Sequence, residues 1–198
     1  MNGLFLLSQG GIIGISVAAG VVVLLAIILI VWYISTYNKL QALKNRAEEG
    51  WSTIDVQLKK RYDLVPNLVE TVKGYAAHES KTLEAVIAAR NAAMTATGDG
   101  KMAAENALTG TLKSLFALQE NYPQLKANTN FMDLQSQLKS IETEIASARR
   151  YYNGTVKELN TKIDMFFAGI VARKMRLEKR KYFELDSEEE RKNVSVKF

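Results

Sequence analysis

The sequence predicts an all-α fold in which an N-terminal transmembrane helix precedes an antiparallel long-helix bundle of two long and two short helices. Two observations predict this class: an uncharged apolar stretch at residues 11–34, and apolar residues that recur every three or four positions after residue 37. No segment has the alternating pattern of a strand. The 26 basic and 21 acidic residues all follow residue 38, so the remainder has the composition of a water-facing domain.

The apolar stretch GIIGISVAAGVVVLLAIILIVWYI is about 36 Å long as a helix, which exceeds the roughly 30 Å of a hydrocarbon core. A cleaved signal peptide is one alternative, but its apolar part has only ~7–15 residues and follows basic residues, which positions 1–10 lack. A buried helix of a soluble core is the other alternative. We predict an uncleaved anchor at residues 11–34, preceded by a short tail at residues 1–10.

Aromatic and basic residues mark the end of the span. Trp32, Tyr33 and Tyr37 lie at its C-terminal end, where amphipathic rings favour the headgroup level. Three basic residues follow closely: Lys39, Lys44 and Arg46. The positive-inside rule therefore predicts a single-pass protein with its N-terminus outside and its bundle domain in the cytoplasm.

The bundle domain is predicted over residues 37–183, with a charged tail at 184–198. Pro66 lies inside the first long helix, and residues 97–100 form the clearest turn in the chain. The helices are predicted at residues 37–77, 80–97, 101–121 and 131–170, the last without a break.

Six basic residues follow the fourth helix, which short connections direct back toward the membrane. They are either a solvated helix C-terminus, stabilised by the helix dipole, or a contact with anionic lipid headgroups. Nucleic acid is not expected as a partner, because acidic residues follow at 184–190 and no binding motif occurs. The six are Arg173, Lys174, Arg176, Lys179, Arg180 and Lys181.

Two features predict self-association. The membrane-proximal halves of the long helices lack two neighbours, and their apolar stripe faces either a second copy, giving a homo-oligomer, or extra cover from the C-terminal tail. This stripe consists of Leu40, Leu43, Leu159 and Ile163. In the span, Gly11, Gly14 and Gly20 are candidates for close packing between spans.

Polar side chains interrupt the apolar stripes of the bundle at four positions. Buried groups of this kind need partners, which Asp63, Glu70, Glu142 or tyrosine hydroxyls can supply. A paired polar layer that fixes the register of the bundle is the main interpretation, and a ligand or partner site is the alternative. The four are Arg61, Arg90, Arg149 and Asn153.

Motifs for catalysis, metals and cofactors are not found. Cysteine is absent, and His78, the single histidine, has no Glu-x-x-His spacing that would indicate a di-iron site. No phosphate-binding loop, dinucleotide fingerprint or nucleophile elbow occurs. We therefore predict no catalytic residue, no metal and no cofactor.

The segments WSTIDVQLKKRYDLVPNLVETVKGYAAHESKTLEAVIAAR (residues 51–90) and YPQLKANTNFMDLQSQLKSIETEIASARRYYNGTVKELN (residues 122–160) closely resemble the LemA family of bacterial membrane proteins. The terminus Val196–Phe198 is also similar. The resemblance implies one N-terminal span in the bacterial inner membrane and a long-helix bundle. It carries over no established enzymatic activity. Residues 166–169 depart from the usual Phe-Pro of the family, which favours a continuous fourth helix.

The expected function is a non-enzymatic, membrane-anchored helical scaffold that self-associates and organises or remodels membrane. The alternative is a membrane-tethered adaptor or regulatory module that binds another protein through the distal end of its bundle, near Ala76–Ser80 and Tyr122–Asn130.

Overall fold

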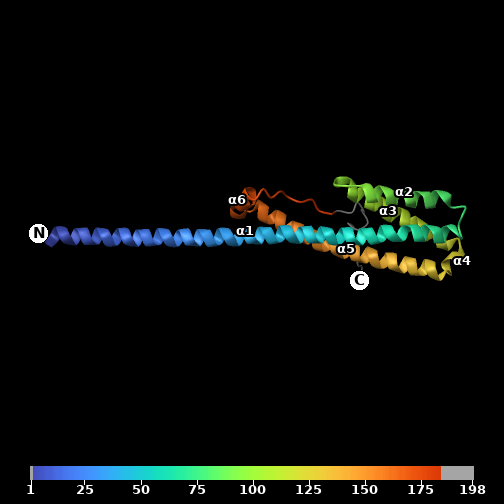
Figure 1. The fold of residues 1–198 in the computed structure, drawn as a ribbon, viewed down its shortest axis with the longest axis horizontal. Coiled ribbons are helices and arrows are strands. Elements are labelled where there is room, and N and C mark those ends of the chain that lie inside the picture. Colours follow the sequence, from blue (N-terminus) through green and yellow to red (C-terminus); the bar gives the residue numbers. More distant parts are fainter. Residues whose placement is uncertain (1, 184–198) are drawn as a thin grey trace, which may run out of the picture. The chain divides into compact units, whose positions relative to one another are not determined.

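The computed structural model describes residues 2–183, with side chains at residues 16–98 and 100–183 (Figure 1). The described residues form helices and no strand, so the all-α prediction is confirmed. Gly11, Gly14 and the predicted tail at 184–198 lie outside the described side chains. The elements are α1 (Asn2–Lys73), α2 (Ser80–Thr95), α3 (Asp99–Ala117), the 3-10 turn η1 (Leu118–Glu120), α4 (Pro123–Lys126), α5 (Thr129–Asp164) and α6 (Phe166–Lys174).

The chain divides into two compact units. Unit 1 combines Met1–Arg46 with Val156–Arg180, and unit 2 combines Ala47–Thr155 with Lys181–Phe198. Helices α1 and α5 each contribute to both units, so each unit contains segments that are far apart in the sequence.

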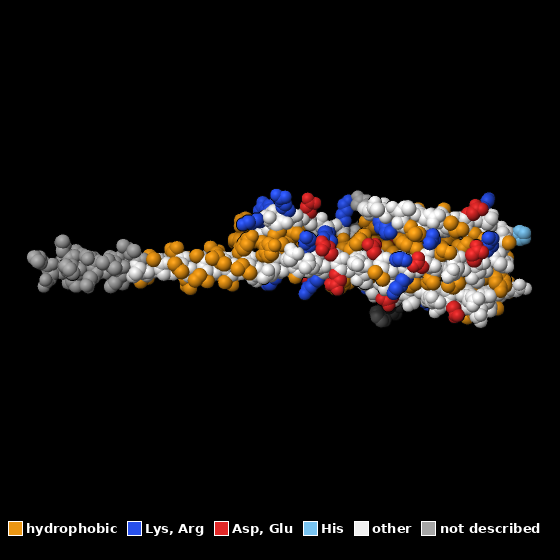
Figure 2. Space-filling model, in the orientation of Figure 1, with side chains coloured by type: hydrophobic (Ala, Val, Ile, Leu, Met, Phe, Trp, Pro, Cys, Tyr) orange, Lys and Arg blue, Asp and Glu red, His pale blue; other side chains and the backbone are white. Residues whose placement is uncertain are grey.

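Helix α1 is long and apolar enough in its N-terminal part to cross a membrane. Every described side chain from Ser16 to Trp32 is exposed, and Figure 2 shows a continuous apolar surface on this part of the helix. An isolated helix with apolar side chains all around is suited to lipid rather than water. No break separates this part from the residues that follow, since α1 continues past Pro66 to Lys73.

The predicted continuous fourth helix is wrong. Helix α5 ends at Asp164, Met165 has an extended backbone (φ −66°, ψ 138°), and α6 begins at Phe166. Phe166 and Ile170, which continue the apolar spacing of α5 in the sequence, are 77% and 51% exposed. The break turns a different face of α6 inward, and the burial of Val171 and Ala172 compensates for the helical hydrogen bonds that are lost.

The core of unit 1 is the apolar stripe that was expected to be uncovered. Leu40, Leu43 and Leu159 are each at most 4% exposed, because Val171 and Ala172 of α6 pack against them. Ile163, Tyr33, Met175 and Leu177 pack around this cluster. The expectation of an exposed stripe is therefore wrong, and of the two interpretations the structure favours cover from the C-terminal part of the chain.

Helix α6 ends in a Schellman motif with arginine at the position that usually holds glycine. Arg176 has a positive φ of 53°. Its N–H donates to the carbonyl of Arg173, and the N–H of Leu177 donates to the carbonyl of Ala172. Leu177 packs on the unit 1 core, which is the apolar contact typical of the motif. A side chain in this backbone region costs about 1–2 kcal/mol.

Arg176→Gly is accordingly expected to stabilise unit 1 by about 0.5–1 kcal/mol, since glycine adopts a positive φ without strain. Urea unfolding of the full chain in detergent measures the change. Glu178→Gly is the matched control, because this exposed neighbour has no positive φ. Glycine there should only raise the conformational entropy of the unfolded chain and so lower the stability of the protein. Loss of stability in both variants would contradict the prediction.

Unit 2 contains the packed bundle, in which α2 lies against α3. Its distal end is closed by polar contacts, as Tyr122 donates to Glu79 (3.1 Å) and Asn128 donates to the hydroxyl of Tyr75 (2.9 Å). Helix α4 was not predicted; it begins with Pro123 at its first turn, where proline is well tolerated. The large, fully buried side chains of this core are Ile54, Leu58, Val65, Leu68, Leu108, Leu115, Leu125, Phe131 and Leu138.

Candidate functional site

The first candidate site is the outer face of α6 in unit 1. Phe166, Phe167 and Ile170 are 77%, 66% and 51% exposed. The ring of Phe167 lies edge-on to Trp32, with centroids 6.0 Å apart. The predicted interface residue Trp32 and the exposed rings of α6 therefore form one aromatic surface.

Basic side chains accompany this aromatic surface. The ammonium group of Lys174 lies 5.4 Å from the ring centroid of Tyr33, so the basic segment returns to the aromatic end of the span. Lys179 pairs with Asp164 at 2.8 Å, and Figure 2 shows Lys and Arg side chains gathered over this part of the chain. Of the predicted interface residues in unit 1, Tyr37, Arg173, Lys174, Arg176 and Lys179 are exposed, and Arg180 is half-buried. Lys181 is exposed in unit 2.

A cavity of about 460 Å³ lies beside the aromatic surface. Lys39 and Lys162 line it together with Trp32, Phe166 and Phe167. Two ammonium groups beside aromatic rings suit a ligand that has both an anionic and an apolar part.

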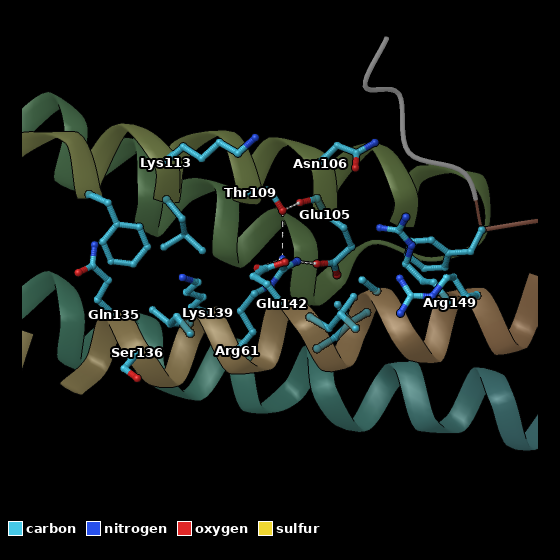
Figure 3. Close-up of a pocket in the computed structure, with 18 of the residues that line it drawn as sticks. Arg61, Glu105, Asn106, Thr109, Lys113, Gln135, Ser136, Lys139, Glu142 and Arg149 are labelled. Carbon is cyan, nitrogen blue, oxygen red and sulfur yellow. Dashed lines mark hydrogen bonds and ion pairs between the residues drawn. The ribbon is translucent and has the colours of Figure 1, made fainter. Parts of the chain in front are cut away.

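The second candidate site is a buried ion cluster in unit 2. The Arg61 side chain is 2% exposed, and its guanidinium donates to Glu105, to Glu142 (2.6 Å) and to Thr109 (3.1 Å), as Figure 3 shows. Glu105 also accepts from Tyr62 and lies 3.4 Å from the ammonium of Lys101. Two cations therefore balance two carboxylates, of which Glu105 is buried in the core and Glu142 is partly exposed. The pairing satisfies charges that would otherwise be costly to bury.

Tyr62 is fixed in its protonated form by this cluster. Burial, and then the hydrogen bond to Glu105, raise the pKa of Tyr62 above its ordinary range. The phenol consequently remains a hydrogen-bond donor. Its lasting donation to Glu105 favours a structural role for the cluster over proton transfer.

The four residues predicted as one polar layer lie in two groups. Arg90 joins the ion cluster indirectly, since its Nε donates to the carbonyl of Tyr62 at 2.8 Å. Arg149 lies 5.4 Å from the ring centroid of Phe183, and Asn153 bonds to the backbone of the same residue. The second group thus holds the returning chain.

Glu105 is the member of the ion cluster that the sequence patterns did not single out. It is 3% exposed and bonds to both Arg61 and Tyr62. A signal was present, because Glu105 precedes Leu108 and Leu112 at the helical spacing of the inward face. Glu142, one of the partners expected for the polar layer, does bond to Arg61.

A groove opens above the ion cluster in unit 2. Its volume is about 1190 Å³, and α1, α3 and α5 line it (Figure 3). Leu58, Leu112, Phe116, Leu138 and Ile145 supply apolar surface along the groove. The exposed bases among the lining residues are Lys113, Lys139 and Arg150.

These features define a helical-bundle protein with an N-terminal helix apolar enough to anchor it in a membrane. The sequence profile of the LemA family matches residues 50–198, so the chain belongs to the LemA family. The protein LemA of Metamycoplasma hominis is 27% identical over 150 residues, which cover 73% of this chain and 67% of that relative. The resemblance found in the sequence is therefore confirmed.

Proposed function

We propose that this protein is a non-enzymatic, membrane-anchored helical scaffold that attaches to the bilayer at two points and organises the membrane through self-association. The span is the first attachment. The exposed face of α6 is the second, and it is the observation that supports the proposal: Phe166, Phe167 and Ile170 project beside a basic segment that returns to Tyr33.

The physical argument combines two favourable terms. Each Lys or Arg near an anionic leaflet contributes about 1 kcal/mol, and buried aromatic rings add apolar transfer energy. Neither term is available in water, where Phe166 would remain 77% exposed. The cavity lined by Lys39 and Lys162 suits an anionic headgroup. Such lipids are abundant in the cytoplasmic leaflet, and the positive-inside rule favours the same side for the bundle in a bacterial inner membrane.

We assign self-association to the span rather than to the leucine stripe, because Leu40, Leu43 and Leu159 are buried within the chain. Gly20 leaves open space on the exposed apolar helix, where a second span can approach closely. Replacing Gly11, Gly14 and Gly20 with leucine should reduce the oligomer size in mild detergent; an unchanged size would contradict this assignment.

Site-directed labelling tests the second attachment, since the chain has no cysteine of its own. A spin label at Ile170→Cys in the full chain should be accessible to oxygen and shielded from a polar relaxation agent in vesicles with anionic lipid. Thr161→Cys, an exposed site on α5 of the same unit, is the matched control and should remain water-accessible.

Neutralising Arg173, Lys174, Arg176 and Lys179 to glutamine should return the label at position 170 to water. The same return is expected in vesicles of neutral lipid, because the electrostatic term is lost there. Equal water accessibility at positions 170 and 161 in anionic vesicles would overturn the proposal.

A membrane-tethered adaptor is the second candidate function. The groove of unit 2 favours it, since the groove offers both apolar and basic surface. The distal end favours it less, because Tyr122 and Asn128 there bond to Glu79 and Tyr75. The size of the purified protein in mild detergent separates the two: a large homomeric assembly supports the scaffold, and a monomer that binds one other protein supports the adaptor.

A further inference from the structure

We propose that the groove of unit 2 is the binding site for the chain's own acidic C-terminal tail, residues 184–198. This goes beyond the proposed function, because it concerns unit 2 rather than the membrane-facing part of unit 1.

Phe183, the last described residue, places the start of the tail at one end of the groove. Its ring lines the groove, is 3% exposed, and lies 5.8 Å from the ring centroid of Trp51. Asn153 makes two hydrogen bonds to the backbone of Phe183. Its side-chain amide donates to the carbonyl (3.0 Å), and its side-chain oxygen accepts from the N–H (2.8 Å). The tail therefore leaves from a fixed point.

A second asparagine of α5 holds the returning chain in the same way. Asn160 accepts from the N–H of Arg180 (3.0 Å) and donates to its carbonyl (2.9 Å). From Arg180 to Phe183 the returning chain advances three residues, which is about 10 Å when extended. From Asn160 to Asn153 helix α5 spans seven residues, which is about 10.5 Å, so the two lengths match. The returning chain consequently runs extended and antiparallel to α5.

The same seven-residue step continues along α5 beyond Asn153. It leads to Ala146, then to Lys139 and then to Met132. All three α5 residues line the groove. The groove therefore continues the path that Asn160 and Asn153 begin.

Charge and size both favour this occupant. Residues 184–190 hold five acidic side chains and no base, whereas the groove exposes Lys113, Lys139 and Arg150. The side-chain amide nitrogen of Asn106 in the groove is buried without an acceptor among the described residues, and a carboxylate would supply one. At about 1190 Å³ the groove is larger than the roughly 300–1,000 Å³ of small-molecule pockets.

A tether also favours weak docking. If the tether gives the tail an effective concentration of roughly 1 mM and the Kd of docking is about 0.1 mM, the ratio of docked to undocked tail is about ten.

Cysteine labelling of the full chain tests the docking. Gln135→Cys lines the groove, whereas Gln137→Cys is exposed on the opposite face of α5. Maleimide labelling of each site is compared between the native tail and a tail with Glu188, Glu189 and Glu190 changed to lysine. Charge reversal should speed labelling at position 135 about tenfold and leave position 137 unchanged, at every protein concentration.

Three outcomes would overturn the proposal. The first is an equal labelling rate at position 135 with both tails. The second is protection that disappears on dilution, which indicates the tail of a second copy. The third is protection that arises only when a polyglutamate peptide is added, which indicates an external acidic partner. Circular dichroism of each variant confirms that the helices are retained.

Discussion

Replacing Arg61 with alanine is expected to lower the free energy of unfolding of unit 2 by about 3–5 kcal/mol, because it removes one partner of a buried ion pair. The side chain of Glu105 is only 4% exposed, so without the guanidinium it remains in the core beside Tyr62 and one lysine. Glu142, at 39% exposed, can turn toward water. The cost therefore comes chiefly from Glu105, whose carboxylate loses its best partner.

Urea unfolding of the full chain in detergent measures this loss. In a Trp32→Phe background, the fluorescence of Trp51 reports on unit 2, where this ring contacts Tyr152 and Phe183. Lys59→Ala is the control, because Lys59 belongs to an exposed pair with Asp63 and should change stability by at most about 0.5 kcal/mol.

A double variant separates lost charge compensation from lost packing. Arg61→Met with Glu105→Gln removes both charges while keeping similar volumes, and it should recover much of the stability lost in Arg61→Ala. The interpretation fails if Arg61→Ala costs no more than Lys59→Ala, or if the double variant is less stable than the single one.

The ion cluster also shows what the sequence could and could not predict. Arg61 was identifiable because it occupies an apolar-face position between Leu58 and Val65, and such a residue needs a partner. Helical periodicity gives the face of a residue, but it does not give the depth at which two helices meet. Several acids therefore remained possible partners, and Glu105 was overlooked although it has the same spacing.

The apolar N-terminal helix, the all-α class and the family were predictable because they depend on local patterns of the sequence. The path of the chain after Asp164 was not, since it depends on a tertiary gain. Periodicity through Phe166 and Ile170 favours one long helix, but the burial of Val171 and Ala172 against Leu40 is available only if the helix breaks. The leucine stripe was misassigned to a second copy for the same reason.

Gly169→Ala should test that break directly, with an expected loss of about 1–3 kcal/mol in unit 1. A Cβ at position 169 would lie 2.7 Å from the carbonyl oxygen of Ile163, which is backbone and cannot rotate away as a flexible side chain would. The same glycine donates its N–H to the carbonyl of Met165 at 2.7 Å, so its backbone is held close to the turn between α5 and α6.

Gly154→Ala is the matched control, and it should change stability in the opposite direction. A Cβ at Gly154 in α5 would meet nothing within 4 Å, so alanine should stabilise the helix by about 0.5–1 kcal/mol. Helix propensity alone predicts the same gain for Gly169, which lies within α6. If urea unfolding shows that Gly169→Ala lowers stability while Gly154→Ala raises it, close approach to Ile163 decides the outcome at position 169. A gain of stability in both variants would contradict the helix break and the cover that α6 gives to Leu40.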